Sequence, residues 1–298
     1  MILTLENGKQ LRGDLILSAI LRSDLAPIPV TLEAEIRAGE EGFDGQLAEG
    51  KLLTLATGDT LHIVKSERIV RPYVQGSRIL DGFRVTALLA ACLPVAYVRS
   101  RAIVKEDATL SAIYRAAGAS VSVKSDFPVK RFSCLIGDVP SFQIARVLQE
   151  EGGVVRWKSK RLEFLPLRGL NAADAVRTLP GRATEDEDAG FLERHAVPWF
   201  FSLDSAGGFI YGNRDKPRSV RYAPFKTEIQ LRNMTRALIR RRVVKTGYDQ
   251  RICAGDCVTF EDGAKYTVLT AAHCFSNGSE EGGASDQHTR LWLGEVDE

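Results

Sequence analysis

The sequence lacks an excess of charge of one sign. Its 40 lysines and arginines oppose 38 aspartates and glutamates, which leaves a formal net charge of +2 over 298 residues. A charge this small predicts no overall attraction to nucleic acid or to a membrane surface. The charge is uneven along the chain, however. Residues 1–60 carry ten acids and five bases, whereas Thr235–Lys245 carries five bases and no acid.

A long apolar run is also missing. The longest candidate, Val85–Val98, is shorter than the roughly 20 apolar residues that cross a bilayer as a helix, and it contains Pro94. The N-terminal residues have no basic stretch followed by an uninterrupted apolar core, which is the pattern of a secretory signal. We therefore expect neither a membrane-spanning segment nor a signal peptide.

Cysteine is scarce and odd in number, which argues against a framework of disulfides in a chain without a secretion signal. We expect free, buried thiols at all five positions: Cys92, Cys134, Cys253, Cys257 and Cys274. Three of these cysteines, together with His273, could be considered as zinc ligands. The adjacency of His273 and Cys274, and the strand-like alternation around the other two, disfavour that interpretation. The sequence predicts no metal site and no cofactor.

The peptide LTAAHC, residues 269–274, raises the question of a hydrolase. It resembles the histidine signature of trypsin-like serine proteases, in which the histidine is the general base and the nucleophilic serine follows in a Gly-rich loop. No such loop follows His273, and no Gly-x-Ser-x-Gly motif is present. The nearest serines, Ser276, Ser279 and Ser285, belong to a polar stretch typical of a hairpin loop. A hydrolase using His273 or Cys274 is therefore the disfavoured alternative, and we predict no catalytic residue.

The same peptide is typical of an apolar strand of small residues. Strict alternation would place Tyr266, Val268, Thr270 and Ala272 on one face, and Thr267, Leu269, Ala271 and His273 on the other.

The composition, 44% hydrophobic and 26% charged, is that of an ordinary globular protein, and the length allows two domains or one domain with an insertion. Short alternating segments separated by Gly, Asp and Asn turns fill residues 1–98 and return in residues 218–298. In one of them Leu32, Ala34 and Ile36 alternate with polar residues. We predict a mainly β fold in which two similar β-barrel tube domains, 1–98 and 218–298, flank a small α+β domain.

Residues 99–168 form this predicted α+β insert. Leu110, Ile113, Tyr114 and Ala117 have helical spacing within Glu106–Gly118. A second helix is predicted with Ser141 as its N-cap, an apolar stripe and a stop at two glycines; the stripe is Phe142, Ala145 and Leu148, and the glycines are Gly152 and Gly153. A hairpin of Val154–Lys158 and Arg161–Leu167 follows, and we expect Leu148 and Phe164 to anchor the core of the insert.

Residues 169–217 are predicted to be a loop-rich connection. The acidic run at 184–188 favours a solvated loop over a metal-binding cluster. An aromatic hairpin turns around Ser205–Gly208, and its residues Trp199, Phe200 and Phe201 could either pack within the chain or form part of a subunit seam. A Gly-Asp pair precedes an alternating strand pair twice, at residues 58–59 and 255–256, as expected of two related units.

The insert resembles a stretch of phage late control protein D, baseplate hub proteins and type VI secretion spikes. The resemblance is specific over about sixty residues and rests on a Cys-x-x-Gly-like segment, a helix ending in Leu-x-Glu-Glu-Gly and a hairpin with aromatic and leucine positions. The matching residues are Cys134, Gly137, Leu148, Glu150, Glu151, Gly152, Trp157, Leu162 and Phe164.

This resemblance implies a structural hub without catalytic residues. Three chains would form a homotrimeric ring of six similar barrels that adapts a sixfold tail tube to a threefold central spike. The implied partners are the tail tube or a distal tail protein and a separate spike, with tape-measure and baseplate wedge proteins as further candidates. The implied location is the virion tail, after assembly in the host cytoplasm. The hub of a related contractile injection system is the alternative.

Arginines at positions 240–242 raise a third possibility, nucleic-acid binding. No aromatic platform interleaves with them, so a solvated or interface-lining strand is the favoured interpretation. Alternation predicts Arg240 and Arg242 on one face, with Arg241 on the other, lining an inter-subunit or channel-facing surface.

Overall fold

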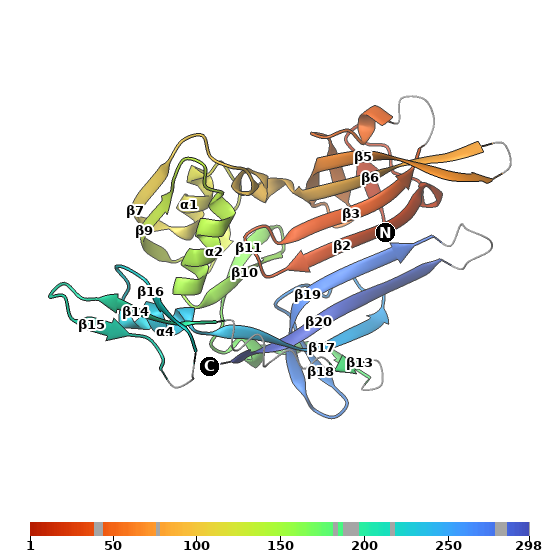
Figure 1. Ribbon diagram of the computed structural model, residues 1–298. Helices are drawn as coiled ribbons and strands as arrows, with labels where there is room; N and C mark the ends of the chain where they lie inside the picture. Colours follow the sequence, from red (N-terminus) through yellow and green to blue (C-terminus); the bar gives the residue numbers. More distant parts are fainter. Residues whose placement is uncertain are drawn as a thin grey trace.

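A computed structural model describes residues 1–38, 44–75, 78–180, 184–186, 197–214, 218–277 and 285–297 (Figure 1). Up to the end of the insert, the strands and helices are β1 (Leu3–Leu5), β2 (Ile16–Asp24), β3 (Val30–Arg37), β4 (Leu52–Leu55), β5 (Thr60–Gln75), β6 (Arg78–Leu89), β7 (Ile103–Thr109), α1 (Leu110–Ala116), β8 (Val123–Lys124), β9 (Pro128–Cys134), α2 (Pro140–Glu150), β10 (Gly153–Lys158) and β11 (Arg161–Pro166). The remainder comprises β12 (Ala175–Leu179), β13 (Thr184–Asp186), β14 (Trp199–Leu203), β15 (Phe209–Tyr211), β16 (Val220–Tyr222), α4 (Glu228–Met234), β17 (Ala237–Gly247), β18 (Cys257–Phe260), β19 (Lys265–Ser276) and β20 (Asp286–Asp297).

The prediction of a mainly β fold is confirmed, and one large sheet dominates it. Its strands follow the order β1-β4-β5-β6-β3-β2-β19-β20-β17-β13, with β18 beside β19 and β12 beside β18. The early and late strands of the chain meet where β2 and β19 pair antiparallel, from Ser18 opposite Ser276 to Asp24 opposite Thr270 (Figure 1). The first and last parts of the chain therefore share one continuous sheet.

Alternation explains the first strands well. In β3 the residues Val30, Leu32, Ala34 and Ile36 are buried, and the residues between them face away from the core. This buried face belongs to a hydrophobic cluster that continues into the insert, up to Val155, Leu162 and Phe164. The predicted anchors Leu148 and Phe164 are both buried in this cluster, as expected.

The first predicted helix forms but begins later than Glu106. Residues Ile103–Thr109 instead make β7, which pairs with β9, and Thr109 caps the helix by accepting a hydrogen bond from the Ala112 amide. The four residues with helical spacing are all buried, as predicted: Leu110, Ile113, Tyr114 and Ala117.

The second helix has a different start and a different buried face from those predicted. Pro140 occupies its first turn and Val139 is the N-cap, so Ser141 is not the cap. A proline suits this position because its fixed φ matches the helix and its missing N–H would have no helical partner. The predicted stripe was wrong at Phe142, which is 69% exposed, and at Ala145, which is also exposed. The buried face instead consists of Ile144, Val147 and Leu148.

The hairpin after this helix is confirmed, with β10 and β11 paired from Gly153 opposite Pro166 to Lys158 opposite Arg161. The aromatic hairpin is confirmed as β14 and β15. The connection between them is less irregular than predicted. Strand β12 pairs parallel with β18, and Thr184–Asp186, the start of the acidic run, pairs antiparallel with β17. The rest of that run, residues 187–188, lies outside the described residues.

Two β-bulges overturn the predicted alternation in the last strands. An extra residue, Leu269, interrupts the pairing of β19 with β20, so Val268 and Ala271 share one hydrophobic cluster while Thr270 faces the other way. Another extra residue, Arg241, interrupts the pairing of β17 with β20. Because each bulge adds one residue to one strand, the faces exchange beyond it.

No helix within the described ranges is long and apolar enough to span a bilayer.

Candidate functional site

The two Gly-Asp turns identified in the sequence are structural counterparts. Gly58 and Asp59 precede β5, and Gly255 and Asp256 precede β18. Both glycines have positive φ, 78° and 81°, a backbone conformation that glycine adopts without steric cost. A Cβ on Gly58 would come within 2.9 Å of Lys160 Nζ, and one on Gly255 within 2.6 Å of a Leu165 methyl group. Each turn thus lies directly against the β10–β11 hairpin.

Strand β10 presents a donor to each of the two aspartates. Trp157 Nε1 donates to Asp59 Oδ1 at 2.9 Å. Arg156 Nη1 and Lys158 Nζ, its neighbours on the opposite face of the strand, both donate to Asp256 Oδ1, at 2.8 and 2.6 Å. The alternation of the strand therefore lets one short segment bind both halves of the large sheet.

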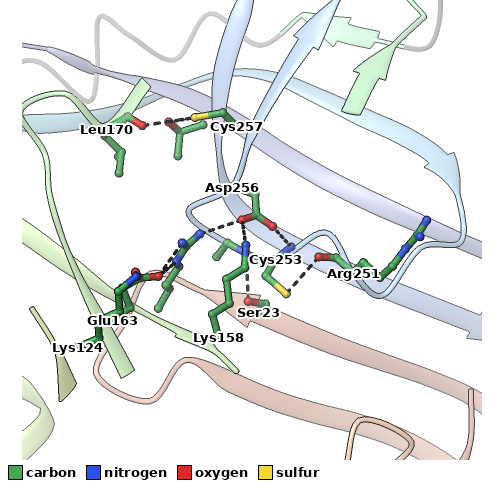
Figure 2. Close-up of polar contacts among 12 residues, drawn as sticks. Ser23, Lys124, Lys158, Glu163, Leu170, Arg251, Cys253, Asp256 and Cys257 are labelled. Atoms are coloured by element: carbon green, nitrogen blue, oxygen red, sulfur yellow. Dashed lines mark hydrogen bonds and ion pairs between the residues drawn. The ribbon is translucent and has the colours of Figure 1, made fainter. Parts of the chain in front are cut away.

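Figure 2 shows the ion network around Asp256, which is almost fully buried. Besides the two cations, its second oxygen accepts from the Cys253 amide at 3.0 Å. Arg156 also pairs with Glu163 at 2.7 Å, and Lys124 pairs with Glu163 as well. Burial by itself would raise the pKa of Glu163, but hydrogen bonds from Lys124 and Arg156 outweigh burial and lower it. The network joins the insert to the C-terminal strands.

The two halves of the large sheet also touch directly at this place. The Ala254 amide donates to Ser23 Oγ at 3.1 Å, and Thr270 Oγ1 donates to Asp24 Oδ1 at 2.6 Å. The Gly-Asp repeat is visible in the sequence, but the contacts of its two aspartates with β10 were not predicted. The only signal available was the repeat itself, because the donors on β10 lie about 100 residues from each aspartate.

The residues that carry the hub resemblance have structural roles. Cys134 is buried at the end of β9, and Gly137 lies in the loop before α2. At the end of α2, Glu150 pairs with Lys226 at 2.6 Å, and its carbonyl accepts from Asn233 Nδ2 at 3.0 Å. Glu151, Gly152, Leu162 and Phe164 belong to the helix end and the hairpin core. The motif therefore holds α2, the hairpin and α4 together.

His273 does not have the surroundings of a general base. It is buried, and its Nδ1 lies 3.1 Å from Thr289 Oγ1, a hydroxyl with no exposed surface. Burial lowers the pKa of His273 to about 4 and raises the pKa of Cys274 above its ordinary value. Among the candidate serines, Ser276 ends β19, Ser285 precedes β20, and Ser279 is outside the described residues. Among the described residues, His273 is almost completely covered, with 2% of its surface exposed.

All five cysteines are free thiols, and Cys92, Cys134 and Cys257 are buried as expected, whereas Cys253 and Cys274 are partly exposed. In the described part of the chain, no three His, Cys, Asp or Glu side chains gather as they would around a metal ion.

The β14–β16 sheet divides the aromatic segment between two environments. On one face, Phe200 packs with Leu231 and Met234 of α4. On the other face, Trp199 and Phe201 join an uninterrupted series of ring contacts with neighbouring strands. Its members are Trp199, Tyr211, Phe209, Phe201 and Tyr222, with centroids 5.2–6.1 Å apart. Because Phe209 and Tyr222 are exposed by more than half, this series is an apolar surface open to a partner.

The outer face of the large sheet is charged across the β2–β19 junction. An open depression of about 550 Å³ lies there, and its lining includes Arg22, Glu33, Arg240, Thr270 and Arg290. Arg240 therefore faces this surface, whereas Arg242 lies over the rings of Phe260 and Tyr266 on the other side. The prediction that Arg240 and Arg242 share a face was wrong, because the bulge at Arg241 separates them. Arg241 itself pairs with Glu295 at 2.7 Å.

The comparison with solved structures finds this fold in tail proteins. A tail protein from Neisseria meningitidis MC58 superposes with a TM-score of 0.66 at 11% identity, over 99% of this chain and 96% of that one. The 43 kDa tail protein of prophage MuSo2 from Shewanella oneidensis gives 0.61 at 12% identity, over 98% and 96%. An Escherichia coli type VI secretion component, described as structurally similar to phage T4 tail proteins, gives 0.57 at 10% identity, over 95% and 74%.

No family model matches the sequence, and no curated protein matches it either. At these identities the similarities establish the fold, which is the fold of phage tail proteins and of a type VI secretion component. The resemblance drawn from the insert is therefore confirmed at the level of fold over nearly the whole chain.

Proposed function

We propose that this protein is the structural hub of a phage tail baseplate. The observation that carries the proposal is the similarity of almost the entire chain, rather than of one domain, to almost the whole of two tail proteins. The type VI secretion component and a Francisella VgrG complex with a TM-score of 0.57 support a hub in particular. The hub of a related contractile injection system remains the alternative, since the same fold occurs in both groups.

The proposed assembly is a homotrimeric ring. Each chain contributes two related tube units, 1–98 and 218–298, with the insert 99–168 and the connection 169–217 between them. Three chains then present six similar units to a sixfold tail tube and threefold symmetry to a central spike. The equivalent Gly-Asp turns on the two sides of the β10–β11 hairpin support this internal relationship, because each anchors its own unit to the same strand.

Two surfaces have complementary roles in this ring. The exposed aromatic rings of the β14–β16 sheet, which include Phe209 and Tyr222, form the contact between neighbouring chains of the ring. Aromatic residues are enriched where interfaces bury surface. The charged face of the large sheet, which carries the depression at the β2–β19 junction, lines the central channel of the ring. Arg240 belongs to this lining.

The other partners follow from the same role. The ring would contact the tail tube or a distal tail protein on one side and a separate spike on the other, with tape-measure and wedge proteins nearby. It would be found in the virion tail after assembly in the host cytoplasm. Function resides in these surfaces, and no residue is assigned a catalytic, cofactor-binding or metal-binding role.

The decisive test is the number of copies around the axis. The hub would be purified with its spike, and the intact complex would be measured by native mass spectrometry and reconstructed without imposed symmetry. Three copies are expected. One copy or six copies would end the trimer proposal.

The seam is tested by substitution. Replacing Phe209 and Tyr222 with serine should lower the fraction of trimer in the presence of spike, while the monomer keeps its melting temperature. Phe142→Ser is the matched control, since Phe142 is also exposed by more than half but lies on α2. Equal trimer fractions in all three proteins would remove the aromatic surface from the interface.

A further inference from the structure

Four arginines line one depression beside the aromatic sheet. Its volume is about 480 Å³, and its other lining residues are Gly212, Asn213 and Thr235. The arginines come from separate places in the chain: Arg168 follows β11, Arg214 follows β15, Arg232 lies in α4 and Arg236 precedes β17. Packing of the hairpin, the aromatic sheet and α4 therefore brings the four cations together.

Among the described residues, carboxylates neutralise only part of the positive charge of this depression. Arg232 pairs with Glu228, but Arg236 donates to the amide oxygen of Asn233, at 2.9 Å. Arg214 lies 3.2 Å from the ring centroid of Tyr211. Among the described residues, no carboxylate lines the depression and none pairs with Arg168 or Arg214. Like charges gathered in a concave surface raise the local concentration of anions.

A neighbouring arginine, Arg218, differs from three of these four because, among the described residues, its guanidinium group pairs with an acid within the chain. Arg218 is buried, and it donates to the Thr235 carbonyl at 2.9 Å and to Asp297 at 3.0 Å. Arg236 has a polar support and Arg214 an aromatic one, and among the described residues no carboxylate pairs with Arg168, Arg214 or Arg236. Their N–H groups are thus available for an external anion.

A second depression adjoins the first, so one extended ligand could occupy both. The two share Arg168, and the second has a volume of about 260 Å³. Its lining is partly apolar, from Leu165, Pro166, Leu170 and Val176, and partly charged, from Arg156 and Lys158, which both pair with Asp256, and from the exposed Asp174. A ligand following both depressions would be acidic at one end and apolar further along.

We propose that these depressions bind an extended, acidic polypeptide segment of a partner protein. Arginine forks hold carboxylates through paired hydrogen bonds, and the apolar second depression accepts the side chains that follow. A nucleic acid fits less well for two reasons. Arg214 covers the face of Tyr211 on which a base would stack. Past Arg168, a phosphate backbone would meet two carboxylates, Asp174 and Asp256, whose charges offset those of Arg156 and Lys158. This binding site does not depend on the hub role or on the trimer.

The test uses fluorescence anisotropy with a fluorescein-labelled octaglutamate peptide and the full chain. Salt is kept at about 50 mM, where screening is weak. Arg168→Gln and Arg214→Gln should each weaken binding about tenfold, because a hydrogen bond to a charged group is worth at least a factor of ten in affinity. The double variant should bind more weakly than either single variant. Arg115→Gln, at an exposed position on α1, is the matched control and should stay within about twofold of the unchanged protein. Circular dichroism melts verify that each variant is folded.

Three results would overturn the proposal. The first is the absence of octaglutamate binding by the unchanged protein. The second is the same loss of binding in Arg115→Gln as in the two depression variants, which would indicate attraction to the whole surface. The third is tighter binding of a labelled oligothymidine of equal charge that displaces octaglutamate, which would assign the depression to nucleic acid.

Discussion

Asp256 is the side chain whose loss should most weaken the connection between the insert and the C-terminal strands. Asp256→Asn keeps the size of the side chain but removes the charge that Arg156 and Lys158 share. Losing one partner of a buried ion pair costs about 3–5 kcal/mol when the remaining charge is uncompensated. Here the remaining charges are partly compensated, since Arg156 keeps Glu163 and Lys158 is 41% exposed. We therefore expect a loss of about 2–4 kcal/mol in the free energy of unfolding.

Thermal and urea unfolding would measure this loss. For a chain of this size, the expected decrease in melting temperature is about 4–10 °C. Asp174→Asn is the matched control, because Asp174 lines the same depression as Asp256 but is exposed, and its loss should cost less than about 0.5 kcal/mol. Equal melting temperatures for the two variants would refute the claim that the buried network stabilises the fold.

A double-mutant cycle would then assign the loss to the contact itself. Lys158→Met removes the more exposed of the two cations. If Asp256 acts through these cations, the two substitutions together should cost less than the sum of their separate costs. Strict additivity would place the effect of Asp256 elsewhere, for example in its hydrogen bond from the Cys253 amide.

Three further predictions concern other parts of the chain. Leu148→Ala should lower the free energy of unfolding by about 2–5 kcal/mol. Phe142→Ala, on the exposed side of the same helix, should lower it by less than about 0.5 kcal/mol. Similar urea midpoints for the two variants would contradict the observed buried face of α2. Because the pKa of Glu163 is lowered in the folded chain, its ionised form adds stability above its ordinary pKa of about 4.3, and this stability is lost as the pH falls below that value. The difference in melting temperature between the unchanged protein and Glu163→Gln should therefore shrink from pH 7 to pH 3, and a constant difference would count against the ion network. A fluorophosphonate probe should not label the protein, since His273 is buried and none of the described serines hydrogen-bonds to it; labelling that disappears in His273→Ala would reinstate the hydrolase interpretation.

Local patterns predicted the elements that depend on local contacts. The spacing of Leu110, Ile113 and Tyr114 identified one helix, and alternation identified the β10–β11 hairpin. The face of α2 was misplaced because Phe142 was counted as a core residue by its hydrophobicity alone. Ile144 and Val147, which the structure buries, complete the stripe at the same helical spacing.

Contacts between distant segments could not be predicted in the same way. The bulges at Leu269 and Arg241 both lie opposite residues 292–294 of β20, and neither bulged residue is itself a glycine or proline that would indicate it. The basic depression likewise combines residues from four segments, of which only Arg232 and Arg236 are close in sequence. The Gly-Asp repeat was visible, but its role depended on where the hairpin would lie.

The pairing of β2 with β19 has a consequence for synthesis of the chain. These strands are separated by about 240 residues, which takes about 12–50 s to translate at the usual rate of about 5–20 residues per second. Until β19 emerges, β2 is an unpaired edge of the nascent sheet, and such edges readily pair with other chains. Several ribosomes translating one messenger RNA would bring the unpaired β2 edges of different nascent chains close together. The interval in which only the first strands have folded is therefore the interval in which this edge is most open to pairing with another chain.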